Sequence, residues 1–97
     1  MSNIIKSVVI TDQKILLEYN GNFYGIESHS NGVSSLTINN SAIDPDKLIG
    51  REVLDTRNLR LTCDFVVKDH KLTNLDYLGY LFLLDNDEIL TAKITLV

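Results

Sequence analysis

Hydrophobic and polar residues alternate with a period of two along most of this chain, which is the spacing of a strand with one buried face. The clearest alternation places apolar side chains at every second position from Leu59 to Val67, among them Cys63 and Phe65. No stretch has the 3.6-residue period of a long amphipathic helix. The pattern therefore predicts a mainly β fold.

The first forty residues predict four consecutive strands, over 4–11, 14–19, 23–28 and 33–39. Asn20-Gly21 separates the second strand from the third, and Asn-Gly is a strong hairpin signal because both residues tolerate positive φ. The segment His29-Ser30-Asn31-Gly32 has the same turn chemistry before the fourth strand. We therefore expect a four-stranded meander in this half of the chain.

A short helix or 3₁₀ segment is predicted over 44–50, after the fourth strand. Asp44 is a suitable N-cap, Pro45 suits the first helical position, and Gly50 suits the end. This segment allows barely two turns, so we expect its Leu48 and Ile49 to pack against the sheet.

Strand patterning returns from Val53, with a turn or bulge expected at 56–58 and loop residues around Lys71 and Thr73. Residues 77–84 are apolar on both faces, which predicts a central strand. A turn at 85–87 and a final strand over 88–97 complete the chain. If its last residues, 94–97, lie at a sheet edge, their open backbone groups favour pairing with a partner.

These elements predict one β-rich domain over residues 1–97, mainly β with α+β as the variant. A sheet must bury its apolar face against a second layer, and no long helix is available to provide it. We therefore expect an antiparallel meander that folds into a small sandwich or open barrel, with one short helix near 44–50. Self-pairing into a homodimer is the other way to cover the sheet.

The charge of the chain adds an expectation about partners. The 97 residues carry a formal net charge of −4, which opposes non-specific binding to nucleic acid. Residues 47–71 hold six of the nine basic residues and form either a contact patch or a solvated face. The candidate contacts for a protein partner are one basic pair and one acidic turn: Arg57, Arg60, Asp85, Asp87 and Glu88.

Several targeting and membrane classes are not expected. The N-terminal residues lack the basic and apolar regions of a signal peptide, and no apolar run approaches the ~20 residues of a membrane helix. Cys63 is the single cysteine, so no internal disulfide can form. The sequence thus favours a cytoplasmic protein that does not bind membranes.

No motif for catalysis, a metal or a cofactor is present. His29, His70 and Cys63 lack the spacing of zinc ligands, and no glycine-rich phosphate loop occurs. Ser28 and Ser30 flank His29, but neighbouring residues in a strand or turn point in different directions. We therefore predict no catalytic residue, no metal and no cofactor, and keep a pocket near His29 or His70 as an alternative.

One short segment carries a family resemblance. Residues 46–51 read Asp-Lys-Leu-Ile-Gly-Arg, followed by an apolar aromatic strand, an acidic turn and a last strand. This arrangement resembles small uncharacterised β-rich proteins of phages and prophages, in which a meander precedes an L-I-G-[K/R] step. The closely spaced cysteines of that group are missing here. The resemblance implies a phage or bacterial cytoplasmic setting and no defined activity.

Together these features predict a non-enzymatic protein-binding module, and the resemblance points to a phage-encoded accessory or inhibitor protein. Binding would use an edge strand or the acidic turn. The alternatives are a homo-oligomeric structural or assembly protein, and a small-ligand binder or enzyme with a pocket near His29 or His70.

Overall fold

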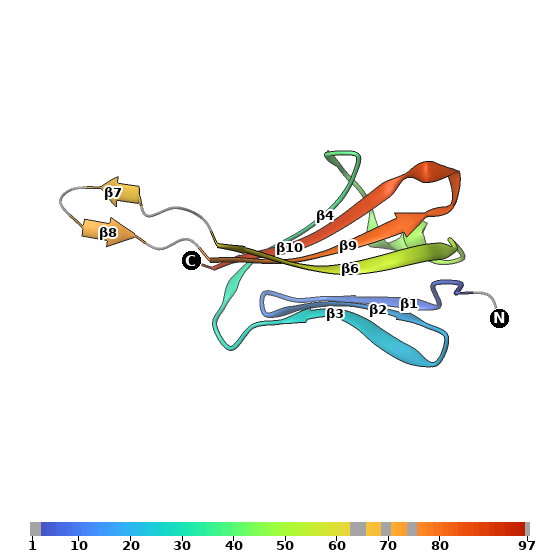
Figure 1. Ribbon diagram of the computed structural model, residues 1–97. Coiled ribbons are helices and arrows are strands. Elements are labelled where there is room, and N and C mark those ends of the chain that lie inside the picture. The colour runs from blue at the N-terminus through green and yellow to red at the C-terminus, as the bar shows by residue number, and fades with distance from the viewer. Residues whose placement is uncertain (1–2, 63–65, 69–70, 74–75, 97) are drawn as a thin grey trace.

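The computed structural model describes residues 3–62, 66–68, 71–73 and 76–96, and for those of them that fall within 58–78, and for Leu96, it describes the backbone alone. The described chain is mainly β, as predicted: it has two antiparallel sheets, two short 3₁₀ helices and no α-helix (Figure 1). None of the helices in these ranges is long and apolar enough to cross a membrane.

The small sheet comes from the N-terminal part of the chain, in the order β1-β2-β3. Its strands are β1 (Ser7–Ile10), β2 (Lys14–Tyr19) and β3 (Asn22–Glu27). Asn20 and Gly21 join β2 to β3 with φ values of 53° and 75°, which is the backbone of a two-residue type I′ turn. The hairpin predicted at this dipeptide is therefore confirmed.

The large sheet has the order β5-β4-β10-β9-β6. Its strands are β4 (Gly32–Ile38), β5 (Ser41–Ala42), β6 (Val53–Thr62), β9 (Asp76–Leu84) and β10 (Ile89–Leu96). A separate hairpin, β7 (Val66–Lys68) with β8 (Lys71–Thr73), lies beyond one end of the two sheets in Figure 1. The loop predicted around Lys71 and Thr73 is wrong, because these residues pair with Lys68 and Val66.

The four-stranded meander is also wrong, because β4 leaves the small sheet. Gly32 N still donates to Asp12 O at 2.8 Å, but from Gly32 onward β4 pairs with β10 of the large sheet. The crossing depends on a residue without a side chain, since an ideal Cβ at Gly32 would lie 2.6 Å from Thr95 O. The turn chemistry of residues 29–32 was predicted, but the change of sheet was not.

The C-terminal strand lies inside the large sheet and not at its edge. β10 pairs with β4 on one side and with β9 on the other. The expectation that 94–97 offers an open edge is therefore wrong over the described residues. The prediction of a central strand at 77–84 is confirmed, since β9 lies between β10 and β6.

The two sheets stack face to face and enclose the core. The large sheet contributes Phe82, Leu90, Ala92 and Ile94, whose alternation along β9 and β10 places them on one face. The small sheet contributes the inward side chains of β2 and β3: Ile15, Leu17, Tyr19 and Ile26. Each sheet therefore has one buried face and one open face, as expected for a sandwich.

The N-terminal segment joins the two sheets at one corner. Ile4 bridges Glu52, and Ile5 N donates to Arg51 O at 2.9 Å, before the chain enters β1. The predicted helix is η1 (Pro45–Leu48), with Asp44 as its N-cap. Its Leu48 is fully buried, but Ile49 is 51% exposed, so only the first of the two residues expected to pack on the sheet does so.

The bulge in β6 lies earlier than predicted. Residues 56–58 are regular strand, and the register shifts between Val53 and Asp55 instead. The extra residue, Leu54, lies in the bulge, and its side chain is exposed. Beyond the bulge, Asp55 and Arg57 pair with Leu83 and Leu81, which places these four residues on the outer face of the large sheet.

Candidate functional site

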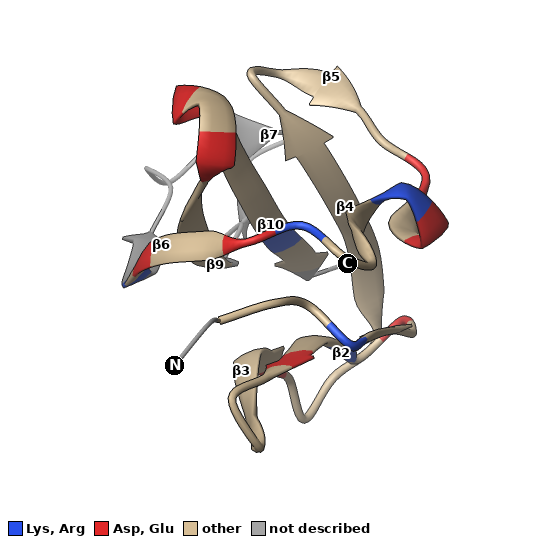
Figure 2. Ribbon diagram, turned by 90° about the vertical axis from the view of Figure 1, so that its right-hand side faces the viewer, with Lys and Arg blue, Asp and Glu red and all other residues tan. Residues whose placement is uncertain are grey.

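The acidic turn between β9 and β10 is held by an arginine from another part of the chain. The turn contains η2 (Asp85–Asp87) and Glu88 (Figure 2). Arg51 Nε donates to Asp85 Oδ1 at 2.8 Å, and Arg51 Nη2 donates to Glu88 Oε1 at 2.6 Å. Arg51 Nη2 also reaches Asp85 O at 3.2 Å. Two of the three predicted acidic contacts therefore stabilise the turn itself.

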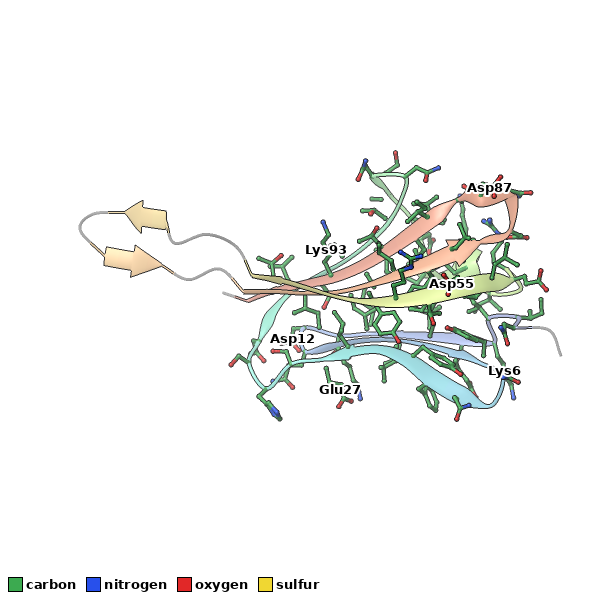
Figure 3. All side chains as sticks on the ribbon, viewed as in Figure 1. Lys6, Asp12, Glu27, Asp55, Asp87 and Lys93 are labelled. Carbon is green, nitrogen blue, oxygen red and sulfur yellow. The ribbon has the colours of Figure 1, made fainter. Side chains whose placement is uncertain are left out.

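These contacts change the electrostatics of the corner. The hydrogen bonds from Arg51 to Asp85 and Glu88 raise the pKa of Arg51 above its ordinary value, so this side chain stays charged. Asp87 is the acidic residue of the turn that is exposed, and Figure 3 shows it at the end of the β9–β10 connection. Of the three acids, Asp87 is the one most accessible to a partner.

The predicted basic contacts lie on β6, at the opposite edge of the large sheet from β5. Arg57 Nε lies 3.7 Å from Asp55 Oδ2, and the two side chains are 78% and 57% exposed. Arg60 pairs with Leu78 in the β6–β9 ladder, and its side chain is outside the described set. Among the side chains that the structure describes, Arg57 thus has one weak, solvated ion pair, which leaves its guanidinium available.

Arg57 and Asp55 border an apolar depression on the outer face of the large sheet, which we call the outer-face depression. It has a volume of about 220 Å³ and is lined by Asp55, Arg57, Leu81, Leu83 and Ile89. Its apolar residues come from β9 and β10, on the face opposite the core. Ile89 is 46% exposed and Leu81 and Leu83 are half-buried, so this floor meets solvent.

A second, more polar hollow adjoins the outer-face depression at Ile89. It is lined by Asn39, Asn40, Ile89 and Thr91 and has a volume of about 250 Å³. Both asparagines have positive φ, and Asn39 Oδ1 accepts from Ile89 N at 3.2 Å. Together the two hollows form an apolar centre with polar side chains on both flanks.

A polar hollow of about 250 Å³ lies beside β6 on its inner side, and Tyr19, Tyr24 and Thr56 are among its lining residues. Tyr19 is 3% exposed, stacks on Tyr24 at a centroid distance of 4.2 Å and meets the edge of Phe82. Burial raises the pKa of Tyr19 to about 12. Thr56 lies beside the Tyr19 hydroxyl, but the geometry of the contact does not reach that of a hydrogen bond, and no other described residue provides one.

His29 borders an open polar hollow of about 430 Å³, with Thr11, Gln13, Lys14, Glu27 and Ser28. No ion pair joins His29 to a carboxylate among the described side chains, although Glu27 lines the same hollow. The Ser28 hydroxyl donates to Ser30 O at 2.8 Å, so it is occupied within its own turn. His70 and Cys63 lie outside the described residues.

In the described part of the chain, the acidic turn is the first place to look for possible metal ligands. There, no three or more His, Cys, Asp and Glu side chains come together as possible metal ligands. The carboxylates of Asp85 and Glu88 meet a guanidinium instead.

The sequence pattern identified Arg57 but not the apolar residues beside it. Leu81 and Leu83 carried a usable signal, because 77–84 is apolar on both faces although the small sheet covers only one. The role of Arg51 had no local signal, since its partners lie 34 and 37 residues away.

The chain matches no family model, no curated protein and no solved structure.

Proposed function

We propose that this chain is a non-enzymatic protein-binding module that recognises its partner through the outer-face depression. The supporting observation is an apolar floor of Leu81, Leu83 and Ile89 on a sheet face that no described element covers. Arg57 and Asp55 at its border provide one donor and one acceptor, which pair only weakly with each other. An apolar centre with a polar rim is typical of a protein interface.

The sequence resemblance suggests a setting for this proposal. A phage-encoded accessory or inhibitor protein of the bacterial cytoplasm needs a contact surface and no catalytic constellation. The net charge of −4 favours a partner that is not nucleic acid. The partner we expect is a protein with an apolar side chain that enters the depression and an acidic group that meets Arg57.

Affinity capture from the native host with matched variants tests the proposal. Ile89→Lys places a charge on the floor of the depression, where we expect capture of the partner to fall by about tenfold or more. Phe23→Lys is the control, because Phe23 is 59% exposed on β3 of the other sheet. Equal capture by the wild type and Ile89→Lys, or equal loss in both variants, would contradict the proposed surface.

The structure changes which other variants are informative. Charge reversal at Asp85 or Glu88 breaks contacts with Arg51, so a loss of binding there has two causes. Asp87→Asn avoids this problem, because Asp87 has no ion pair among the described side chains and asparagine tolerates its positive φ of 58°. Proline at any of residues 94–96 would interrupt the ladders of a central strand and is not a binding test.

A second proposed function is a small-ligand binder at the hollow beside His29. The observation in its favour is a polar lining that combines Lys14, Glu27 and His29. Nuclear magnetic resonance with a set of small charged metabolites tests it. Resonances of these residues that shift on addition of a metabolite, and do not shift in His29→Ala, would favour this function over the protein-binding proposal.

A further inference from the structure

β6 is the long open edge of the large sheet. It is the last strand of that sheet, and β9 is its only strand partner among the described residues. The N-terminal segment covers its beginning, where Ile4 bridges Glu52 and Val53 N donates to Asn3 O at 2.8 Å. From Leu54 onward no described strand covers this edge, which Figure 2 shows at the outside of the sheet. An edge of this kind is a template for another strand.

The other edge strands of the two described sheets are shorter. β5 has two residues, β1 has four and β3 has six, whereas β6 has ten. The outward backbone groups of β6 can also be assigned. Leu84 N donates to Glu88 O at 2.8 Å, so Leu84 and, by alternation, Phe82 direct their backbone groups toward β10. Thr56 lies opposite Phe82, so its N–H and C=O point away from β9. The Thr56 N–H meets Asp55 Oδ1 at 2.9 Å on that side.

The charges on either side of Thr56 are complementary to those of a second copy of the same strand. Asp55 and Arg57 flank Thr56 on β6 and lie on the same outer face. If a second β6 pairs antiparallel about Thr56, each Asp55 lies directly opposite the other copy's Arg57. A parallel arrangement in the same register would place like charges opposite each other. The edge therefore favours one direction of self-pairing.

We infer that two copies of this chain associate through β6, antiparallel and centred on Thr56. Thr56 pairs with its symmetry mate by two backbone hydrogen bonds, and residues 54–58 form the shared ladder. Its length is limited at both ends by the N-terminal segment, which occupies the edge at Val53. On pairing, Asp55 Oδ1 releases the Thr56 N–H, which it accepts at 2.9 Å in the single chain. Asp55 also exchanges its weak 3.7 Å contact with Arg57 of its own strand for a cross-strand contact with Arg57 of the other copy.

This association goes beyond the proposed function. The two large sheets become one continuous sheet, and the two outer-face depressions lie on its same face, because Asp55 and Arg57 line them. A pair of depressions related by a two-fold axis fits a partner that is itself symmetric or repeated, and binding at two sites increases avidity.

Sedimentation velocity from about 1 to about 200 µM tests the inference, since a short strand interface predicts micromolar affinity. We expect the wild type to dimerise. Arg57→Asp and Asp55→Arg each place like charges opposite one another at two symmetric positions, and should weaken the dimer about tenfold or more. The double variant Asp55→Arg/Arg57→Asp restores complementarity and should restore the dimer.

Two further variants separate strand pairing from a general effect of charge. Lys93→Asp changes charge equally on the same face but on central β10, and should leave the dimer unchanged. Thr56→Pro removes the outward N–H and should abolish the dimer while thermal unfolding by circular dichroism shows an intact fold. If Thr56→Pro does not fold, the single variants Arg57→Asp and Asp55→Arg and their double variant test the strand pairing by themselves.

A monomer at all concentrations, a double variant without recovery, or equal weakening by Lys93→Asp would each overturn the inference. These outcomes are separable from the proposed function. A monomer that still loses its partner in Ile89→Lys refutes the β6 pairing and leaves the binding module in place.

Discussion

Two arginines on the same stretch of chain, Arg51 and Arg57, have opposite roles. Arg51 is 24% exposed and donates to three oxygens of Asp85 and Glu88 at 2.6–3.2 Å. Arg57 is 78% exposed, and the one carboxylate near it among the described side chains lies at 3.7 Å. The first cation closes a corner of the fold, and the second is left for solvent or a partner. A charged residue is available for recognition only when its own fold does not already use it.

The same contrast holds for the acids. Asp85 and Glu88 were predicted as partner contacts because they cluster in one turn, yet Arg51 binds both. Asp55, which has no such cluster around it in the sequence, borders the outer-face depression. Clustering of like charge in sequence is thus a poor guide to accessible charge, because the neutralising residue can come from a distant segment.

The largest expected effect concerns Tyr19, and it tests whether the inner side of β6 is less accessible to water than its exposed outer side. Burial raises the pKa of Tyr19 to about 12 in the fold, from the ordinary 10.0 of a tyrosine. The raised pKa stabilises the fold fully below pH 10, and this contribution is lost as the pH rises through 12. Two pH units correspond to about 2–3 kcal/mol.

Urea unfolding between pH 9 and 12 measures this loss, with Tyr19→Phe as the control because it cannot titrate. We expect the wild type to lose more stability than the variant over that range. If stability falls with pH in parallel for the wild type and Tyr19→Phe, water reaches Tyr19 from the β6 edge. The inner side of β6 would then be as accessible to water as its outer side.

The next effect compares the two arginines directly. Arg51→Ala removes charge-assisted hydrogen bonds and leaves Asp85 and Glu88 close together, so the free energy of unfolding should fall by about 1–2 kcal/mol. Arg57→Ala removes one exposed pair and should cost less than about 0.5 kcal/mol. Chemical denaturation of both variants gives the comparison. Similar losses would show that the corner at Arg51 is as solvated as the edge.

The smallest effect is found within the acidic turn. Glu88→Gln weakens the contact with Arg51 and should cost about 0.5–1 kcal/mol, since this pair is partly exposed. Asp87→Asn removes the same charge from a residue with no ion pair in the described set and should be neutral within about 0.3 kcal/mol. Thermal unfolding at low and at ~1 M salt distinguishes them, because screening should reduce only the Glu88 effect.

Much of the local structure was predictable. The Asn20-Gly21 hairpin, the cap and start of η1 at Asp44 and Pro45, and the turn at 85–87 all follow from residues whose backbone preferences act over a few positions. The central position of 77–84 was predictable for a different reason, since a strand apolar on both faces is costly to leave at an edge. The mainly β class follows from the same alternation.

The assignment of strands to sheets was not predictable in the same way. Period-two alternation makes a segment suitable for strand pairing but does not determine which strand it pairs with. We therefore expected β4 beside β3, whereas it pairs with β10. For the same reason residues 94–97 were considered as a possible edge, whereas β10 is central and β6 is the long edge strand of the large sheet. The bulge at Leu54 decides which of its neighbours face outward, and it lies ahead of the predicted position at 56–58.

By itself the sequence determined where most strands and turns lie, because these properties depend on neighbours within a few residues. It also determined that the strands must bury their apolar faces against one another. Only the tertiary structure decided that Arg51 binds the acidic turn, that Arg57 lies exposed beside Leu81 and Ile89, and that β6 is an edge strand of the large sheet. Those outcomes depend on which strands pair across distances of tens of residues, and alternation alone is compatible with many such pairings.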